Sequence, residues 1–273
     1  MCETCGCGEP EVSNAVKSNE HDHKHPHDHE HDDLHEHDHP GHTHEPATSG
    51  RKILDVNKEV LHENNLMAAR NRGFFEGRKI FCLNLVSSPG SGKTTILEKT
   101  MLALKPEVRM MAIEGDQQTS LDARRIMATG IPVVQINTGA GCHLDARMVN
   151  KAMNDLPMPE KSILFIENVG NLVCPAMFDL GETKRVLIMS VTEGDDKPLK
   201  YPNMFESSHL CLINKSDLLP YVDFNPEEFM KNARLINPHI EFMKISARTG
   251  EGMNQWYEWL VNQTELFSLH LKI

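Results

Sequence analysis

The chain has 273 residues, 39% of them hydrophobic and 25% charged, with a formal net charge of −11. This length is sufficient for a buried core in one large domain or two small ones. Basic residues are not in excess, which argues against a nucleic-acid-binding protein. No run approaches the length of about eighteen apolar residues that a transmembrane helix needs, and no apolar segment resembles a secretory signal. Seven cysteines, three of them in the first seven residues, fit metal thiolates in a reducing compartment. We therefore expect a cytoplasmic protein without a membrane partner.

Residues 1–50 differ in composition from the rest of the chain. They contain two lysines against twelve Asp and Glu, whereas residues 51–273 contain 26 basic and 27 acidic side chains. Their apolar side chains are few, and the first aromatic residue of the chain is Phe74. Burial of so few apolar groups cannot offset the entropy lost on ordering. We expect residues 1–50 to form a disordered tail.

The tail carries two metal-binding patterns. Cys2, Cys5 and Cys7 place three thiols within six residues, and together with the chain amine they could surround one Ni²⁺ or Zn²⁺ ion. Eleven histidines follow between His21 and His44, mostly alternating with Asp or Glu, a spacing that gives several weak, exchangeable sites. We favour nickel capture or storage. The alternatives are a chance or redox cysteine cluster, and a solvated polar tail with incidental metal affinity.

The next segment, residues 51–76, carries apolar residues at helical spacing from Ile53 to Arg72. This pattern predicts an amphipathic helix that ends before Gly73 and lies outside the domain formed by residues 77–273. The apolar face either packs on that domain or docks a partner.

From residue 80 onward, short apolar runs alternate with helical patterns. We expect strands at Ile80–Val86, Val108–Ile113, Ile131–Ile136, Ile163–Ile166, Val186–Val191, Leu210–Ile213 and Phe242–Ile245. We expect helices at Thr94–Leu104, Leu121–Thr129, Leu144–Asn154, Pro226–Ile236 and Gly252–Gln263. Such alternation predicts an α/β fold, with a mainly parallel sheet and helices on both faces. Ligands in such sheets lie at the carboxyl ends of the strands.

A phosphate-binding loop follows the first of these strands, where residues 88–95 read Ser-Pro-Gly-Ser-Gly-Lys-Thr-Thr. Its amides and the start of the next helix can surround nucleotide phosphates. Lys93 would reach the β and γ phosphates, and the Thr94 hydroxyl would hold Mg²⁺. Ser87 stands where the general pattern has glycine, and a turn serving packing alone is the alternative. The remaining expected nucleotide contacts in this loop are Ser88, Pro89, Gly90, Ser91, Gly92 and Thr95.

A guanine-binding pattern, Asn214-Lys-Ser-Asp217, ends the strand that begins at Leu210. Asp217 can accept two hydrogen bonds from guanine, Asn214 can bond the base edge, and the Lys215 stem can lie along the ring. Adenine lacks this pair of donors, so the pattern indicates GTP. After the last strand, a turn formed by Ser246, Ala247 and Arg248 is expected to contact the base through its backbone.

Acidic residues at two further strand ends are suited to hydrolysis. Glu167 can orient Mg²⁺ through water, and Gly170 can offer an amide to the γ-phosphate. Asp116 is our candidate for positioning the attacking water. The alternatives are a carboxylate that caps a loop for Glu167 and a helix N-cap for Asp116.

A second metal site is predicted from Cys142, His143 and Cys174. These residues follow strands that should run toward the nucleotide, so they could converge beside the γ-phosphate and respond to hydrolysis. Three unrelated loop residues are the alternative. Cys82 and Cys211 lie inside apolar strands and are expected to be core thiols.

Taken together, these motifs resemble the HypB family, the GTPases that assist nickel insertion into [NiFe]-hydrogenase. The resemblance extends over nearly the whole chain and rests on Cys2-Glu-Thr-Cys-Gly-Cys7, the histidine tract, the phosphate loop, Glu114-Gly-Asp-Gln-Gln118, Gly141-Cys-His143, Glu167-Asn-Val-Gly-Asn-Leu-Val-Cys174 and Asn214-Lys-Ser-Asp217. It implies a fold like that of signal-recognition and partitioning NTPases. It also implies slow GTP hydrolysis, a GTP-bound homodimer, and two partners: a nickel-carrying HypA-type protein and the hydrogenase large-subunit precursor.

The resemblance further implies that Cys2, Cys5 and Cys7 form a tight nickel site, and that Cys142, His143 and Cys174 form a Ni²⁺ or Zn²⁺ site near the dimer interface. Relatives in the wider class often have a lysine where this chain has Ser88. Lys197 is a candidate to replace that charge across a dimer.

Two other protein functions also fit this combination of motifs. A urease accessory GTPase also joins a histidine-rich head to a nickel-linked domain, but it typically has Cys-Pro-His where this chain has Cys142 directly before His143. A nickel storage protein with a vestigial nucleotide fold is the other alternative. The intact Lys93, Thr94 and Asp217 favour an enzyme.

Overall fold

The computed structural model describes residues 49–116 and 121–270, and side chains between Lys58 and Leu269 within those ranges. The predicted Cys2/Cys5/Cys7 cluster, the histidine tract and residues 117–120 lie outside this part of the chain. Within it, no helix combines the length and the apolar character needed to cross a membrane.

Seven strands in the described ranges form one sheet in which every neighbouring pair is parallel, in the order β3-β2-β4-β1-β5-β6-β7. The strands are β1 (Ile80–Ser87), β2 (Met110–Asp116), β3 (Val133–Asn137), β4 (Ser162–Glu167), β5 (Lys184–Ser190), β6 (Leu210–Asn214) and β7 (Glu241–Lys244). β1 and β4 are buried along their whole length, as expected of strands covered on both faces. The predicted α/β class is confirmed, and the sheet is wholly parallel.

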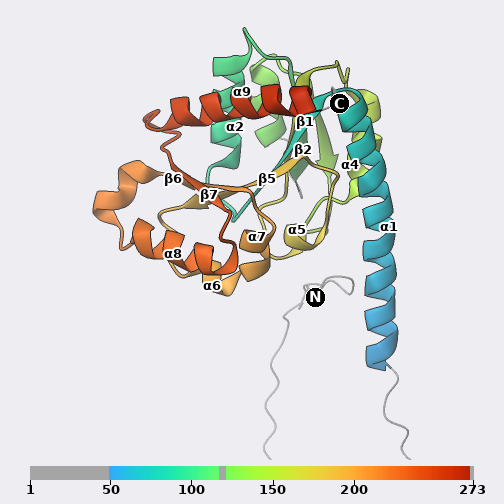
Figure 1. Ribbon diagram of the computed structural model, residues 1–273, viewed down its shortest axis with the longest axis horizontal. Coiled ribbons are helices and arrows are strands. Elements are labelled where there is room, and N and C mark those ends of the chain that lie inside the picture. The colour runs from blue at the N-terminus through green and yellow to red at the C-terminus, as the bar shows by residue number, and fades with distance from the viewer. Residues whose placement is uncertain (1–48, 117–120, 271–273) are drawn as a thin grey trace, which may run out of the picture. The chain divides into compact units, whose positions relative to one another are not determined.

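Helices cover both faces of the sheet. α2 (Lys93–Leu104), α3 (Leu121–Ala128) and α9 (Met253–His270) pack on one face, around a core that includes Met101, Ile126 and Trp256. The other face is covered by α1 (Ser49–Gly77), α4 (Ala146–Ala152) and η1 (Met153–Asp155) over β1, β2 and β4, and by α7 (Pro202–Glu206) and α8 (Pro226–Ile236) over β5 and β6. Figure 1 shows α2 and α9 across the sheet from α7 and α8. The short elements α5 (Cys174–Met177), α6 (Lys197–Lys200) and η2 (Ser216–Tyr221) complete the described fold.

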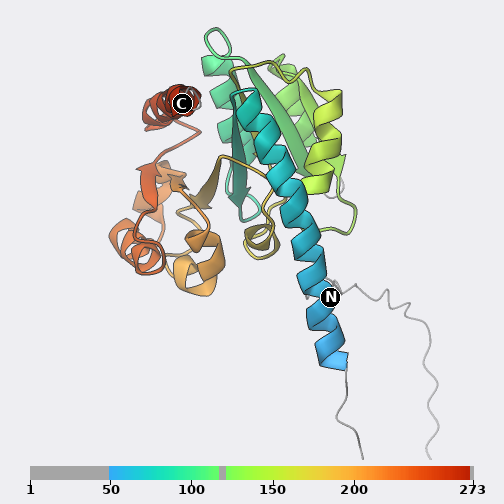
Figure 2. The same cartoon turned by 45° about the vertical axis from the view of Figure 1, so that its right-hand side comes forward.

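From Lys58 to Gly77, α1 packs on the domain that follows it. Ala68 and Phe75 are 0% and 1% exposed, and Asn71 Oδ1 accepts a hydrogen bond of 2.9 Å from Asn150 Nδ2 in α4. The two helices lie side by side in Figure 2. The sequence left open whether this apolar face packs on its own domain or docks a partner. From Lys58 to Gly77 it packs on its own domain.

The predicted end of this helix before Gly73 was wrong, because α1 continues to Gly77. Glycine inside a helix costs about 1 kcal/mol relative to alanine, and burial of Phe75 in the core outweighs that cost. The chain turns after Gly77 through Lys79, which has φ 55°, and then enters β1.

Several other boundaries also differ, and three helices illustrate this. α9 extends to His270 rather than ending at Gln263, the helix predicted from Leu144 begins at Ala146 after an Asp145 cap, and the helix predicted to Thr129 ends at Ala128. The sequence did not predict α5, α6, α7 or η2, because elements of four to six residues are too short to display a period.

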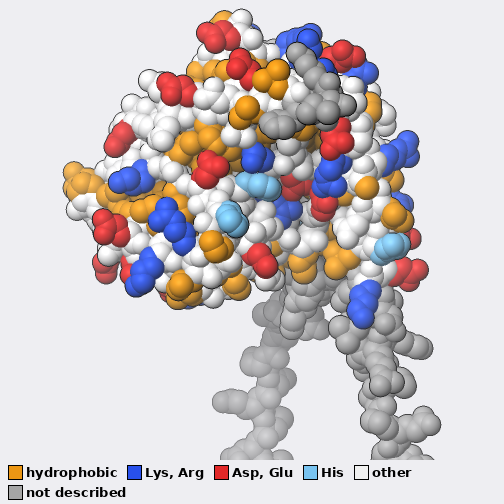
Figure 3. Space-filling view, in the orientation of Figure 1, with side chains coloured by type: hydrophobic (Ala, Val, Ile, Leu, Met, Phe, Trp, Pro, Cys, Tyr) orange, Lys and Arg blue, Asp and Glu red, His pale blue; other side chains and the backbone are white. Residues whose placement is uncertain are grey.

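Acidic and basic side chains are intermixed over the face drawn in Figure 3. This agrees with the nearly balanced charge of residues 51–273.

Candidate functional site

The phosphate loop joins β1 to α2 at the carboxyl edge of the sheet. Gly90 and Gly92 have φ of 72° and 101°, and a Cβ on Gly92 would lie 2.5 Å from Asn214 Nδ2, so only glycine fits there. Lys93 Nζ donates to Ser87 Oγ at 2.7 Å. Ser91 Oγ is buried and has no hydrogen-bond partner among the described residues, which suits a hydroxyl that serves a phosphate oxygen.

Two buried carboxylates stand opposite the loop on neighbouring strands. Glu114 of β2 pairs in register with Glu167 of β4, and Thr94 Oγ1 donates to Glu167 Oε1 at 2.7 Å. Burial raises the pKa of Glu114 to about 8, with repulsion from Glu167 and Asp116 adding to the effect. Burial likewise raises the pKa of Glu167 and lowers the pKa of Lys93.

This arrangement fits a divalent cation with oxygen ligands. Glu114 Oε2 and Glu167 Oε2 are both buried without a hydrogen-bond partner in the described ranges, and the Thr94 hydroxyl lies against Glu167. Hard oxygen donors are the ligands that Mg²⁺ prefers. A cation here would relieve the repulsion between the two carboxylates.

The guanine-binding pattern lies beside the phosphate loop. Asn214 Nδ2 donates to the Ser91 carbonyl at 2.8 Å and its Oδ1 accepts from Ala247 N at 3.1 Å, so one side chain links the two loops. Lys215 Nζ donates to the Gly90 carbonyl at 2.8 Å.

Asp217 belongs to the same loop pair. It is half-buried and accepts a hydrogen bond of 2.6 Å from Ser246 Oγ. Arg248 is exposed, and its carbonyl accepts from Lys99 Nζ at 3.3 Å. The structure thus brings the Asn-Lys-Ser-Asp motif and the Ser246–Arg248 turn together, and their contact with a base stays a prediction.

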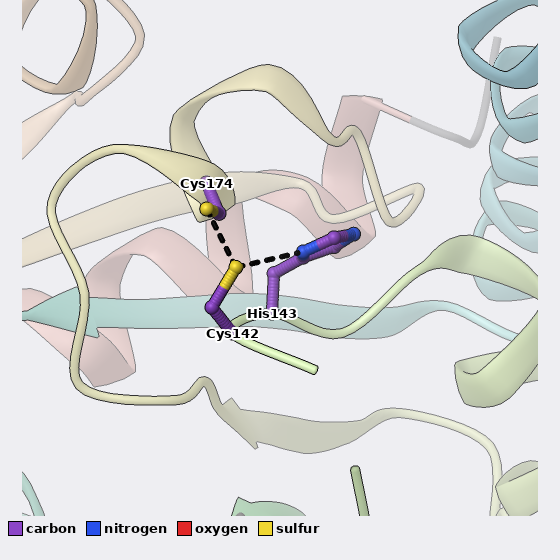
Figure 4. A group of neighbouring side chains, drawn as sticks. All are labelled: Cys142, His143 and Cys174. Carbon is purple, nitrogen blue, oxygen red and sulfur yellow. Dashed lines mark hydrogen bonds between the residues drawn. The ribbon is translucent and has the colours of Figure 1, made fainter. Parts of the chain in front are cut away.

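Three predicted metal ligands converge at the same edge of the sheet. Cys142 and His143 come from the loop between β3 and α4, and Cys174 is the first residue of α5. Cys142 Sγ lies 2.6 Å from Cys174 Sγ and 3.7 Å from His143 Nδ1, and the three ligand atoms lie within 4.8 Å of one another (Figure 4). Burial lowers the pKa of His143, which favours the neutral imidazole that binds metal. Two thiols and an imidazole suit Ni²⁺ or Zn²⁺.

The segments carrying these ligands are held by α1. Asn64 Oδ1 accepts from Ala146 N at 2.9 Å, and its Nδ2 donates to the Asp179 carbonyl at 2.8 Å. Asn71 Nδ2 donates to the carbonyls of Ala146 and Leu180 at 2.8 and 3.0 Å.

Aromatic stacking also fixes one ligand. The ring of His143 stacks on Phe178, with 3.8 Å between ring centroids, and Phe178 is only 6% exposed. The stacking therefore joins the loop that carries His143 to the segment that carries Cys174.

A close contact joins the phosphate loop to the segment that leads to Cys174. A Cβ on Gly170 would lie 3.0 Å from the Cα of Pro89. Gly170 therefore allows the loop after β4 to pass directly against the phosphate loop, four residues before Cys174.

The contacts of the remaining predicted residues do not test their predicted roles. Asp116 ends β2, and its carbonyl accepts from Thr138 N at 2.9 Å. Thr95 Oγ1 accepts from Arg125 Nη2 at 3.1 Å, and Lys197 Nζ lies 5.3 Å from the centroid of the Tyr201 ring. Cys82 and Cys211 are fully buried and their thiol pKa values are raised by burial, so the prediction of core thiols is confirmed.

Several residues that shape these sites escaped the sequence analysis. Glu114 was noted only as part of a motif, although a carboxylate inside an apolar strand is itself a signal. Asn64, Asn71 and Phe178 gave no signal, because their partners are far away in the sequence.

Comparison with known proteins connects these sites to a family. Residues 81–244 match the family model described as CobW/HypB/UreG, nucleotide-binding domain. A relative from Escherichia coli (strain K12), named hydrogenase maturation factor HypB, is 50% identical over 289 residues that cover 96% of this chain and 99% of the relative.

Solved structures give the same relationship. HypB from Archaeoglobus fulgidus superposes with a TM-score of 0.70 and 37% identity, over 74% of this chain and 99% of that one. HypB from Helicobacter pylori in complex with nickel superposes with a TM-score of 0.71 and 34% identity, over 74% of this chain and 95% of that one. The chain belongs to the HypB family of hydrogenase maturation factors, and its P-loop domain is of the CobW/HypB/UreG nucleotide-binding class.

Proposed function

We propose that this protein is a GTP-hydrolysing nickel carrier that assists nickel insertion into the [NiFe]-hydrogenase precursor. The observation that carries the proposal is the pairing of a phosphate loop with a Cys142/His143/Cys174 group, joined through the contact between Gly170 and Pro89. The relatives named hydrogenase maturation factor and the nickel complex of the Helicobacter pylori protein support it.

Each nucleotide residue has a role that its surroundings support. Lys93 stabilises negative charge on the β and γ phosphates, while the loop amides and Ser91 hold the phosphate oxygens. Thr94 and Glu167 would hold Mg²⁺, which when bound neutralises developing phosphate charge. Asp116, at the end of β2, positions the attacking water. Asp217 selects guanine, because its carboxylate accepts from both donors on that base.

Nickel is the cargo of the second site. Cys142, His143 and Cys174 supply two thiolates and an imidazole, and Zn²⁺ is an alternative occupant. Loss of the γ-phosphate would release Gly170 from its position against the phosphate loop and alter the segment that carries Cys174. Nickel affinity would then differ between the GTP and GDP states.

Hydrolysis should be slow, because Ser88 offers no positive charge at a position where related NTPases use lysine. We propose that GTP binding favours a homodimer, in which Lys197 supplies a contact in trans. The partners we propose are a HypA-type nickel carrier and the hydrogenase large-subunit precursor. Cys2, Cys5 and Cys7 would hold nickel tightly ahead of transfer, with the histidine tract as a reserve.

The test combines turnover with metal release. Purified full-length protein loaded with Ni²⁺ is mixed with Mg²⁺ and either GTP, ATP or a non-hydrolysable GTP analogue, and both phosphate release and nickel transfer to a coloured chelator are followed. We expect hydrolysis of GTP but not ATP, and faster nickel transfer with GTP than with the analogue. Absence of GTP hydrolysis would leave only the storage role, and equal transfer in both arms would exclude a nucleotide-controlled carrier.

The role of the tail has its own test. Nickel titration compares the full-length protein with a full-length variant in which Cys2, Cys5 and Cys7 are alanine. We expect the variant to lose the tightest binding step and to keep the weaker ones. An unchanged tight step would assign that site elsewhere.

A further inference from the structure

A buried polar side chain lies directly beyond the nucleotide carboxylate. Asn168 follows Glu167 at the end of β4 and is 1% exposed. Its Oδ1 accepts from Leu144 N at 3.2 Å, and Leu144 is the residue after His143. Its Nδ2 donates to Asn84 Oδ1 at 3.3 Å. Asn168 therefore follows Glu167 directly and contacts both β1, the strand that leads into the phosphate loop, and the loop that carries two of the proposed metal ligands.

The polar contacts continue from Asn84 to the other metal-bearing segment. Asn84 Nδ2 donates to Glu182 Oε1 at 3.1 Å, and Glu182 pairs with Arg185 at 2.8 Å, both side chains being 6% exposed. Arg185 donates through Nη1 to the Ala176 carbonyl at 3.2 Å and through Nη2 to the Phe178 carbonyl at 3.0 Å.

These two acceptors belong to the segment that begins at Cys174, and Phe178 is the residue stacked on His143. The path from Asn168 through Asn84, Glu182 and Arg185 thus reaches both segments that hold metal ligands. We call these four residues the polar chain.

Stability alone is a weak reason for such a chain. Asn84 lies between Leu83 and Leu85 in a fully buried strand, where apolar residues would normally fill the position. Replacing buried ionic groups by well-packed apolar residues is often neutral or stabilising, whereas removing one partner from a satisfied network is costly. Buried polar contacts do impose one defined arrangement on the segments that they join.

We propose that Asn168 is the positioning residue through which the nucleotide state at Glu167–Gly170 sets the geometry of the Cys142/His143/Cys174 group. This inference rests on the proposed function, since it requires nickel affinity to depend on the nucleotide. A shift of the backbone after Glu167 moves the Asn168 side chain, which is bonded to Leu144 N and to Asn84. The displacement reaches Cys142 and His143 through Leu144, and Cys174 through the rest of the polar chain. Because linkage is reciprocal, bound nickel must change nucleotide affinity by the same factor.

Asn71 provides a matched control. It is also buried, with 0% exposure, and it also bonds to both metal-bearing segments, at the carbonyls of Ala146 and Leu180. Its third side-chain partner is Asn150 of α4, so the three partners of its side chain all lie outside β1 and β4. Removing Asn71 should disturb the metal site without disturbing the link to the nucleotide.

The experiment measures the ratio of nickel affinities in two nucleotide states. The full-length chain carries Cys2→Ala, Cys5→Ala and Cys7→Ala in every arm, so that the thiolate-to-nickel absorption band reports Cys142 and Cys174. Ni²⁺ is titrated against a competing chelator, with Mg²⁺ and either GDP or a non-hydrolysable GTP analogue. Asn168→Ala and Asn71→Ala are compared in this background. The same titration of nucleotide, with and without Ni²⁺, gives the reciprocal ratio.

In the parent protein we expect the nickel affinities in the two nucleotide states to differ by at least about fivefold. For Asn168→Ala we expect equal nickel affinities in the two states. For Asn71→Ala we expect nickel affinity to fall in both states, with the ratio between the states unreduced. If the parent protein binds nickel equally well in the two nucleotide states, the proposed function is wrong and so is the role of Asn168. If the parent shows a ratio that Asn168→Ala retains, only the present inference is wrong. If nickel affinity no longer depends on the nucleotide in either variant, Asn168 is only one of several structural contacts, and the inference is also wrong.

A measurement without substitutions applies if Asn168→Ala does not fold. Hydrogen exchange is followed at the amides of Leu144, which donates to Asn168, and Ala146, which donates to Asn64 of α1. We expect protection of the Leu144 amide to differ between the GDP and GTP-analogue states and protection of the Ala146 amide to stay constant. Equal protection of Leu144 in both states would contradict the role of Asn168.

Discussion

The nucleotide site and the proposed metal-binding group of Cys142, His143 and Cys174 lie at the same edge of one sheet but are built in different ways. The nucleotide site is made of short continuous motifs, each at the end of a strand, and several of its residues, such as Pro89 and Gly90, are exposed. The metal-binding group combines two separate loops, and Cys142 and Cys174 are 8% and 0% exposed.

The supports of the two sites differ in the same way. Phosphate-loop residues are held by neighbours within the nucleotide motifs, as when Asn214 bonds the Ser91 carbonyl. The metal-binding group depends on Asn64 and Asn71 of α1, on Phe178 and on the polar chain. The nucleotide site should therefore tolerate changes elsewhere in the fold, whereas the metal site should respond to changes at a distance.

The largest effect should come from Lys93→Ala. This change removes the charge that we propose to stabilise the phosphates, and we expect GTP turnover to fall by about 10²- to 10³-fold, with the nickel absorption band of the nucleotide-free protein retained. Phosphate release is the measurement, and Lys151→Ala, at an exposed lysine on α4, is the control. Turnover reduced less than tenfold would remove Lys93 from its catalytic role.

Cys174→Ser tests the metal-binding group without changing the nucleotide site. Losing one of two thiolates should weaken nickel binding at this group by at least about 10²-fold, since even partners of metal ligands change affinity by about 10- to 100-fold. GDP affinity measured in the absence of nickel should be nearly unchanged. The measurements are nickel titration in the background without tail cysteines and nucleotide binding by fluorescence. Cys211→Ala, at a core thiol of β6, is the control. Equal nickel affinity in both variants would place the site elsewhere.

Sequence predicted much of the fold because its strands are continuous apolar runs that end in recognisable motifs. The phosphate loop and the Asn214–Asp217 motif fix their own surroundings through glycine geometry and short-range hydrogen bonds, so a local pattern was enough. The helix boundary at Gly73 failed because a distant contact, burial of Phe75, outweighed a local preference.

The candidate metal site was only partly predictable. Convergence of Cys142, His143 and Cys174 followed from strand ends that meet at one edge. The contacts that hold them did not follow, because Asn64 and Ala146 are 82 residues apart and Asn84 and Glu182 are 98 apart. Asn84 did leave a local sign, as a polar residue within the apolar run of β1, but its partner is set by the tertiary structure.

Asn64→Ala removes one contact that α1 makes with the segments carrying the proposed metal ligands. The amide of Ala146 and the carbonyl of Asp179 lose their partner, which should cost about 1 to 3 kcal/mol of stability and lower nickel affinity by roughly tenfold. GDP affinity should change little. Thermal unfolding, nickel titration and nucleotide binding measure the three quantities. The control is Leu66→Ala on the same helix, where the Leu66 side chain is 62% exposed. A loss of GDP affinity equal to the loss of nickel affinity would contradict separate supports.

The smallest effect concerns the carboxylates of the nucleotide site. Burial and repulsion raise the pKa of Glu114 from 4.5 to about 8 in the folded protein, so between these values the folded state binds more protons than the unfolded state. Stability without nucleotide and Mg²⁺ should therefore fall as pH rises from 4.5 toward 8. Glu114→Gln removes this contribution. Because solvent and ions screen part of it, we expect about 1 kcal/mol, a Tm difference of roughly 2 to 4 °C between pH 5 and pH 8. Glu160→Gln, at an exposed carboxylate, should reproduce the parent profile. An identical slope in Glu114→Gln would contradict the raised pKa of Glu114 as the source of this pH dependence.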